Sequence, residues 1–334
     1  MLSRVDTRPS WSRGRLLAGR QSVGRILTIV MCMVIFSSYL GLSSAANASV
    51  GDVPMPGPVI GQTENFDPTR YSEYVKATAA TRREKDQLSD LASAARSSGD
   101  WTAFDAQANA RDRRLGASAG LKPIDHTVTG GQPTSKIAPA TVWGTFHFVA
   151  GATQFAQITG YYCGPAAGQS ILAGWAYAGW SFAYGTPNQD GLANLMGTTS
   201  SSGTGIYEWA RGMNGWIWNN KDMPGGWIYK AASTQTTMVN DIRGNIDANW
   251  GAGVNTVELT GGWRYNSHPS GGTIRHFISA FGYDTSANNL NLTDSAANSP
   301  AFNWPNVQPT VAMTNAFLFN FINQSGSDKR GYSY

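Results

Sequence analysis

Residues 157–168, Gln-Ile-Thr-Gly-Tyr-Tyr-Cys-Gly-Pro-Ala-Ala-Gly, constrain the fold of this chain more than any other stretch. Pro165 comes two residues after Cys163, and a helix-favouring run to Ala176 follows it. Because proline is well tolerated in the first turn of a helix, we expect Cys163 at or just before a helix N-terminus. Unpaired backbone N–H groups and the helix dipole favour an anion there, and hence the nucleophilic thiolate. Gln157, six residues earlier, could donate its amide N–H to an oxyanion formed beside the sulfur.

A cysteine nucleophile needs a base that a third group holds in one orientation. The chain has 4 histidines, and only His276 opens a strand-like run, which ends at Asp284. A turn-rich segment (285–289) and a second alternating run (290–294) follow. This pattern predicts a β-hairpin with a longer loop. Folding the second run back brings Asp294 beside His276, where its carboxylate would orient the imidazole.

Other titratable residues rank below these. His268, in a loop between Ser267 and Pro269, is the second candidate for the base, and Asp284 competes with Asp294. Asp284 falls at the hairpin turn, however, where an aspartate needs no catalytic reason. We expect His147 to point off a strand edge and place His126 in a linker. No metal-ligand spacing and no phosphate-binding glycine motif is visible, so we expect no metal and no cofactor.

Together, Gln157, the block Tyr-Tyr-Cys-Gly-Pro-Ala-Ala (161–167) and the block from His276 to Asp294 resemble the C39-like branch of papain-fold cysteine peptidases over about residues 140–325. The resemblance implies an α+β, papain-like fold, in which a helix group with the cysteine at a helix N-terminus packs on an antiparallel sheet. It implies a peptide or protein substrate, with Cys163 as nucleophile, His276 as base, Asp294 as the orienting group and Gln157 as oxyanion donor. No ATP-binding cassette or multi-span membrane region follows, which argues against a role in peptide export.

Two alternatives stay open at this point. The same triad would serve a peptidoglycan or isopeptide amidase, or an acyl transferase. The chain would otherwise be a non-catalytic papain-fold module that binds glycan or peptide through its Gly-Trp-rich middle. Ten of the 12 tryptophans lie between residues 143 and 304, and core packing explains most of them more simply.

Residues 1–48 read as a secretion signal. Six arginines and one acid precede an apolar stretch (26–42), and Ala46-Asn47-Ala48 forms a cleavage site. The alternative is an uncleaved membrane anchor. Cleavage removes Cys32 and leaves 19 basic and 20 acidic residues, a net charge of −1. We therefore expect a secreted, extracellular monomer without nucleic-acid partners and without stable membrane association.

Charge density divides the rest of the chain. Residues 64–115 hold 18 charged residues, whereas 141–334 hold 17 in a segment almost four times as long. We expect linkers at 49–63 and 117–140, a peptidase domain at 141–325 and a flexible tail at 326–334.

The pattern of residues 64–116 predicts a helical hairpin that begins at Asp67-Pro68 and stops at Gly116. It is either a removable pro-segment that covers Cys163 or a fixed accessory module. In the first case the active form would start between Ala117 and Ala140.

Within the peptidase domain the periodicity predicts these elements: a strand at 141–150, a helix from Cys163 to about Tyr177, short helices at 187–196 and 205–212, a helix at 234–250, a strand at 254–260, the hairpin of His276 and Asp294, and a closing element at 310–322 whose type the pattern does not decide.

Overall fold

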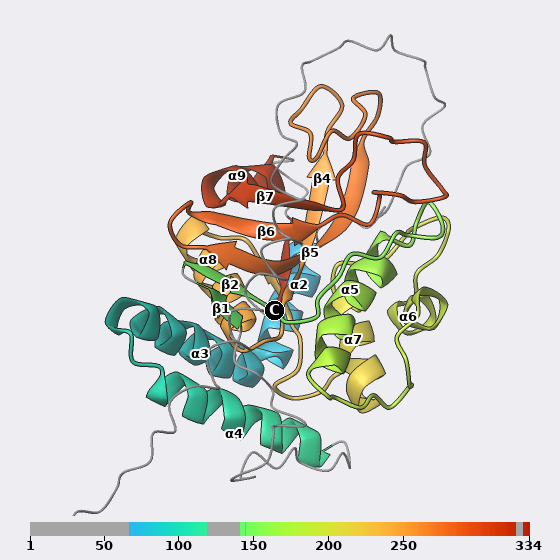
Figure 1. Cartoon of the computed structure of the whole chain (residues 1–334). Coiled ribbons are helices and arrows are strands. Elements are labelled where there is room, and N and C mark those ends of the chain that lie inside the picture. The colour runs from blue at the N-terminus through green and yellow to red at the C-terminus, as the bar shows by residue number, and fades with distance from the viewer. Residues whose placement is uncertain (1–66, 119–140, 144, 325–329) are drawn as a thin grey trace, which may run out of the picture. The chain divides into compact units, whose positions relative to one another are not determined.

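The computed structural model describes residues 67–118, 141–143, 145–324 and 330–334, all within the unit Pro54–Tyr334. They form helices and one antiparallel sheet (Figure 1), which is the predicted α+β class. The helices are α2 (Pro68–Ala77), α3 (Ala79–Ser98), α4 (Thr102–Ser118), α5 (Cys163–Tyr177), α6 (Gln189–Met196), α7 (Glu208–Trp218), α8 (Gln235–Asp247) and α9 (Asn315–Asn323). The strands are β1 (Thr141–Trp143), β2 (Phe146–Phe148), β3 (Tyr229–Ala231), β4 (Ala252–Glu258), β5 (Ile274–Asp284), β6 (Asn289–Thr293), β7 (Thr310–Thr314) and β8 (Gly331–Ser333).

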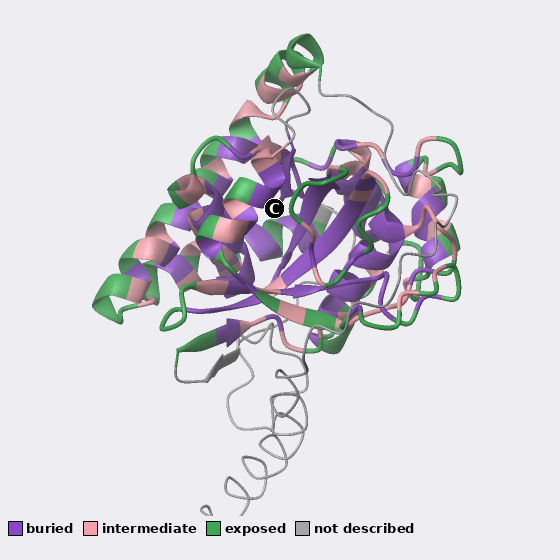
Figure 2. Ribbon diagram, turned by 90° about the horizontal axis from the view of Figure 1, so that it is seen from above, coloured by how far each residue is buried: buried purple, intermediate pink, exposed green. Residues whose placement is uncertain are grey.

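Strand β5 organises the sheet. The order is β1-β2-β5-β4-β8-β3, with β6 paired to β5 and β7 paired to β6. Successive side chains of β5 alternate between the two faces. Phe277 stacks on Trp209 of α7, whereas Ile278 belongs to the hydrophobic cluster of α8 and α9. Helices therefore cover both faces, and β4 and β5 are buried along almost their whole length (Figure 2).

The expectation of a flexible tail at 326–334 is wrong for residues 330–334, which are buried and contain β8, paired with β4 and β3. The structure also refines two predicted elements. The strand expected at 141–150 is a pair of short strands, β1 and β2, because Val142 pairs with His147 in an antiparallel register. The closing element at 310–322 contains both a strand and a helix. Thr314 is the last residue of β7 and also the N-cap of α9, where its hydroxyl accepts a hydrogen bond from the Phe317 N–H. The change from strand to helix therefore takes place at this one residue.

The N-terminal helices differ in part from the predicted hairpin. Asp67 caps α2 by accepting hydrogen bonds from the Thr69 and Arg70 N–H groups, and Pro68 is the first helical residue. The chain then breaks at Thr78, so α2 and α3 are separate helices. Helix α4 continues through Gly116 to Ser118, because one glycine inside a helix costs only about 1 kcal/mol.

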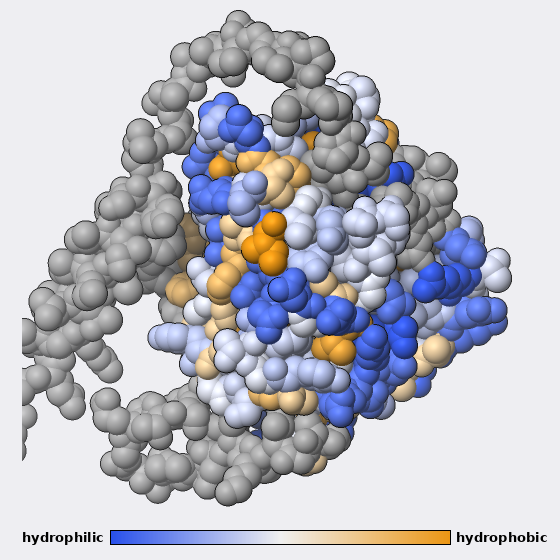
Figure 3. All heavy atoms as spheres, turned by 90° about the vertical axis from the view of Figure 1, so that its right-hand side faces the viewer, coloured by the Kyte–Doolittle hydropathy of each residue, from blue (hydrophilic) through white to orange (hydrophobic). Residues whose placement is uncertain are grey.

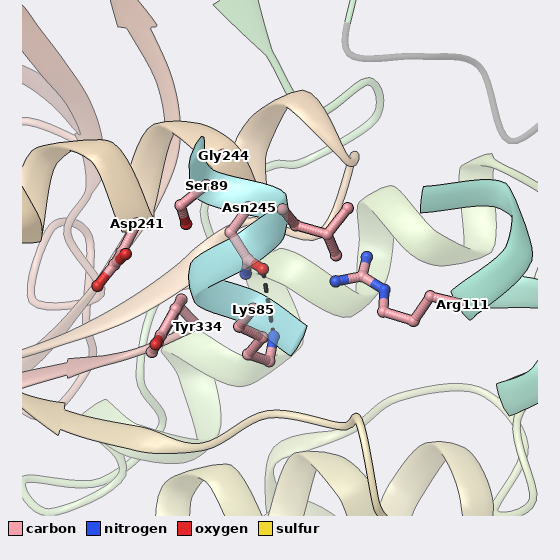
Figure 4. Close-up of a pocket in the computed structure, with 8 residues that line it drawn as sticks. Lys85, Ser89, Arg111, Asp241, Gly244, Asn245 and Tyr334 are labelled. Carbon is pink, nitrogen blue, oxygen red and sulfur yellow. Dashed lines mark hydrogen bonds between the residues drawn. The ribbon is translucent and has the colours of Figure 1, made fainter. Parts of the chain in front are cut away.

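Helices α3 and α4 share the main hydrophobic core. Leu88, Phe104 and Leu115 join the cluster that contains Trp175 and Trp250. Helix α8 approaches α3 so closely that a Cβ at Gly244 would lie 3.0 Å from Ser89 Cα, which explains the glycine. The buried Lys85 points between these helices, where its Nζ lies 3.4 Å from Asn245 Oδ1 and its neighbours include Arg111 and Tyr334 (Figure 4).

Among the described residues, no helix combines the length and the apolar character needed to cross a membrane. On the face that carries α6, the visible described atoms are mainly hydrophilic, with hydrophobic side chains in small separate patches (Figure 3). Large hydrophobic side chains such as Ile158 and Tyr184 are exposed.

Candidate active site

Cys163 is the first residue of α5, where the sequence predicts a helix to begin. Its side chain is buried, and Pro165 lies in the same first turn. A Cβ on Gly164 would overlap the side chain of Thr204, so only glycine lets Thr204 pack over this turn. The indole N–H of Trp209 donates to the Gly164 carbonyl at 3.0 Å and holds the turn from the other side. The start of the helix is thus fixed by packing as well as by proline.

His276 lies near the start of β5, paired with Thr256 of β4. Its Nε2 is 2.9 Å from Asp294 Oδ1. An ionised carboxylate only accepts hydrogen bonds, so Nε2 carries the proton of this bond. Among the described residues, the other ring nitrogen, Nδ1, has no nitrogen or oxygen partner, while the thiol of Cys163 interacts with this same ring. The imidazole therefore stands between the sulfur and the carboxylate.

Charge around His276 favours the imidazolium form. Burial lowers the pKa of His276, but the Asp294 carboxylate and the Cys163 sulfur outweigh burial and raise the pKa from 6.5 to about 10. At neutral pH the ring is consequently protonated. An imidazolium next to the sulfur stabilises a thiolate and can later give its proton to a leaving group.

Asp294 follows β6 directly, and four donors meet its carboxylate. Oδ1 accepts from His276 Nε2 and from the Ala296 N–H, each at 2.9 Å. Oδ2 accepts from Asn266 Nδ2 at 2.8 Å and from His268 Nε2 at 2.9 Å. Burial alone would raise the pKa of Asp294, but the two imidazoles and their hydrogen bonds hold it well below its usual 3.8. This carboxyl group is therefore ionised at neutral pH.

The competing candidates lie elsewhere. His268 contacts the far oxygen of Asp294 and not the thiol side of His276. Asp284 accepts hydrogen bonds from the Ser286 backbone and hydroxyl in the hairpin turn, at 2.8 Å each. The expectation that His147 points off a strand edge is wrong. Because β2 pairs with β5, His147 is buried, stacked on Tyr283 and bonded to Asp247 at 2.9 Å. His126 lies outside the described residues.

Gln157 is fully buried next to the segment that carries Asp294. Its Oε1 accepts from the Ser295 hydroxyl at 3.0 Å, and its Nε2 donates to the Thr159 carbonyl at 2.8 Å. Its backbone N–H donates to the Ser295 carbonyl at 2.8 Å, and the Ser299 hydroxyl donates to its backbone carbonyl at 2.6 Å. A primary amide has two N–H donors. One serves Thr159, and the second is left for another acceptor.

Sequence reasoning missed three polar residues of this network: Glu258, Asn266 and Ser295. Asn266 stands in the segment Asn-Ser-His-Pro, a composition that indicates a turn and nothing more specific. Glu258 lies near the end of the strand predicted at 254–260, where a charged residue is ordinary. Only the fold brings them to Asp294 and Gln157.

Three metal-ligand side chains, His268, His276 and Asp294, have ligand atoms within 4.8 Å of one another. Hydrogen bonds between these same atoms already account for the cluster. We assign no metal to them.

The fold and the site together define a class of protein. In this class of α+β proteins, a thiol at a helix N-terminus lies beside an imidazole and a carboxylate that the sheet supplies. Residues 149–317 match the model of the Peptidase_C39 like family, which is half of the chain. The chain belongs to that family, as the resemblance predicts. The matched range includes Cys163, His276 and Asp294. None of the curated proteins compared with the chain matches it.

Proposed function

We propose that this protein is a cysteine peptidase that hydrolyses peptide bonds through Cys163, His276 and Asp294, on a papain-like arrangement of helices and sheet. The observation that carries the proposal is the orientation of His276. With Nε2 bonded to Asp294, only Nδ1 is left to exchange a proton at the sulfur. The family supports a function of the cysteine-peptidase type.

The reaction follows from these groups. The thiolate of Cys163 attacks the substrate carbonyl carbon, and the carbonyl oxygen becomes an oxyanion. His276 gives its proton to the amide nitrogen, the C–N bond breaks, and the amine leaves a thioester on Cys163. A water molecule then attacks the thioester while His276 accepts its proton. The sulfur leaves as thiolate, the acid product departs and the free enzyme is restored.

Two donors are proposed for the oxyanion. One is the Cys163 backbone N–H, which belongs to the first turn of α5 and has no intrahelical acceptor. The other is the second amide N–H of Gln157, whose orientation Ser295 and Thr159 fix. Donors that are already oriented stabilise the developing charge without reorganisation.

The packing of the tryptophans argues against the alternative of a non-catalytic binding module. Most of the tryptophans of the Gly-Trp-rich middle are buried core residues, including Trp175, Trp209, Trp216, Trp227 and Trp250. These five provide no exposed aromatic face for a glycan or peptide; Trp263, which is 48% exposed, is an exception in this middle region. An amidase or acyl transferase would use the same triad, and the products of the reaction distinguish these from a peptidase.

Secretion is part of the proposal. Its support is the pattern of residues 1–48, which lie outside the described residues. The charge of −1 after cleavage gives no reason to propose nucleic-acid or anionic-membrane partners. The proposed protein acts on peptides as a monomer.

The test is digestion of a denatured protein and of purified cell walls by the wild type and by Cys163→Ala, with the products identified by mass spectrometry. We expect new peptide termini from the denatured protein with the wild type and none with Cys163→Ala. Release of muropeptides without cleavage of protein would replace the peptidase assignment with the cell-wall amidase.

A further inference from the structure

A line of alternating charges continues behind Asp294. His268 Nε2 lies 2.9 Å from Asp294 Oδ2, and His268 Nδ1 lies 2.6 Å from Glu258 Oε1. The side chains of His268, Asp294 and Glu258 have no exposed area, and that of His276 is 1% exposed. The order of the groups is thiol, imidazole, carboxylate, imidazole, carboxylate. The proposed reaction uses the first three, and nothing in it explains why two more ionisable groups are buried.

The geometry fixes the charge on His268. Each of its ring nitrogens faces a carboxylate oxygen, and ionised carboxylates only accept hydrogen bonds. Both nitrogens must therefore carry protons, so His268 is an imidazolium. Glu258 is balanced in turn by Arg264, whose Nη1 lies 3.7 Å from Glu258 Oε2. A buried carboxylate or imidazolium without a partner of opposite charge would strongly destabilise the protein. Because positive and negative groups alternate along this line, each charge has such a partner.

The loop before His268 is built to hold it there. Asn266 and Ser267 have φ angles of 47° and 61°, two consecutive non-glycine residues in the left-handed region. Such conformations are unfavourable for most residues and persist where the surroundings impose them. They let Asn266 Nδ2 and His268 Nε2 meet the same oxygen of Asp294. The ring of Trp304 lies 5.0 Å from that of His268 and covers it.

We propose that His268 is a positioning residue for the peptidase reaction: held as an imidazolium between Glu258 and Asp294, it fixes the far oxygen of the Asp294 carboxylate and offsets part of the negative charge that faces His276. The proposal rests on the proposed function, because it assigns His268 a role through His276. His268 itself touches neither the sulfur nor the position of the substrate.

The consequence for His276 follows from the groups around the two rings. Four residues surround His268: Glu258 at the end of β4, Arg264 and Tyr265 in the following loop, and Asp294 after β6. On the other side of Asp294 lie His276 of β5 and Cys163 of α5. The two ring centroids are 5.4 Å apart, so the positive charge of His268 opposes protonation of His276. His276 is thereby a better proton donor to the leaving amine than it would be beside Asp294 alone.

Three variants test this: His268→Gln, Glu258→Gln and the double variant. His268→Gln removes the positive charge, so His276 should hold its proton more tightly. We expect kcat/KM to fall by about 10- to 100-fold, as for one lost hydrogen bond to a charged group. We also expect the alkaline limb of the pH profile of kcat/KM to move to higher pH. Glu258→Gln keeps an acceptor for Nδ1, so His268 stays charged, but a negative charge is lost; the limb should therefore move less, and towards lower pH.

Controls separate this role from a structural one. Titration of the active thiol gives the fraction of competent enzyme, and all rates are expressed per active site. The double variant removes both charges of the His268–Glu258 pair, so neither of the two is left buried without the other, and it should still show the alkaline shift. If rates per active site and the alkaline limb equal those of the wild type in His268→Gln and in the double variant, His268 is a packing residue and the inference fails.

The imidazole ¹⁵N spectrum of histidine-labelled protein separates this inference from the proposed function. The chain has only 4 histidines, so each signal can be assigned by substitution. His268 should show two protonated ring nitrogens at about pH 8, where an unperturbed histidine is neutral. A neutral tautomer of His268 would overturn the inference even in an active peptidase. A preparation that cleaves no peptide but shows the doubly protonated ring would refute the proposed function alone.

Discussion

The hydroxyl of Ser295 donates a hydrogen bond of 3.0 Å to the side-chain carbonyl oxygen of Gln157. An amide group is planar, so a fixed oxygen also fixes the direction of the two N–H donors. Ser295 is the residue after Asp294, and its backbone carbonyl accepts from the Gln157 N–H as well. One short segment therefore positions both the carboxylate behind His276 and the proposed oxyanion donor.

Ser295→Ala should lower kcat by about 5-fold and leave KM nearly unchanged, because the lost hydrogen bond of about 1 kcal/mol orients a donor that acts mainly in the transition state. Steady-state kinetics on a peptide substrate measures both constants. The matched control is Ser299→Ala, which removes a hydroxyl bonded to the backbone carbonyl of the same glutamine. Equal effects on kcat in the two variants would argue against orientation of the side-chain amide.

Gln157→Ala should slow turnover by about 100- to 1,000-fold, the usual cost of one oxyanion donor. Gln157→Glu is the control of equal size, since its carboxylate can accept the Ser295 bond but offers no N–H to an oxyanion. Both variants should be slow, while their thermal unfolding stays cooperative. A Gln157→Ala enzyme with wild-type kcat would remove Gln157 from the oxyanion site.

Asp294→Asn should destabilise the protein by about 3–5 kcal/mol at pH 6, since it leaves two buried imidazolium groups without their shared carboxylate. The pKa of Asp294 is held low, so its contribution is present above about 3.8 and is lost as the pH falls. The pKa of His276 is raised to about 10, so its contribution is complete below 6.5 and is lost as the pH rises through about 10.

The stability difference between the wild type and Asp294→Asn should accordingly be largest between about pH 4 and 6.5 and shrink towards pH 10. Urea unfolding at pH 6 and pH 10 measures it. A difference that is the same at both pH values would show that the carboxylate does not stabilise the charged imidazoles.

The contacts of α3 and α4 favour the fixed-module interpretation of residues 64–116. Asp112 of α4 accepts a hydrogen bond from the Trp250 indole, and Trp250 contacts Trp175 near the C-terminal end of α5, whereas Cys163 begins that helix. Trp175 comes twelve positions after Cys163 in this helix, which is about 18 Å along the axis. Neither Cys163 nor His276 has a hydrogen bond or ion pair with these helices among those the structure describes.

We therefore predict that cutting the chain at a protease site inserted between residues 118 and 140 leaves the helices bound and the activity unchanged. Size-exclusion chromatography of the cut protein and an assay before and after cutting measure this. Release of the helices together with a rise in activity would instead support the removable pro-segment, with an active form that starts between Ala117 and Ala140.

Local signals in the sequence predicted the helix at Cys163 and the hairpin from His276 to Asp294. Pro165 marks a helix start, and the turn-rich residues 285–289 separate two alternating runs, so both depend on neighbours in the chain. The pairing of β4 with β8, near the end of the described chain, has no such signal. Nor does the packing of Leu88 against the tryptophan core.

The partners of the site show the same limit. Ser295 and Gln157 are separated by 138 positions, and Glu258 and Asp294 meet only through His268. A polar residue in a loop carries no sign of what it will face, because the contact is decided by how the sheet brings the loops together. The prediction for His147 was wrong for the same reason, because its burial depends on the pairing of β2 with β5.

The most direct test of the central claim is to trap the acyl-enzyme. A peptide ester substrate is mixed with the enzyme, the reaction is quenched in acid, and the protein is digested and analysed by mass spectrometry. We predict a transient acyl group on Cys163 in the wild type, a longer-lived one when Gln157 is replaced by alanine, and none in Cys163→Ala, which should also release no product. Product formation by Cys163→Ala at the wild-type rate, or an acyl group on another residue, would contradict the account.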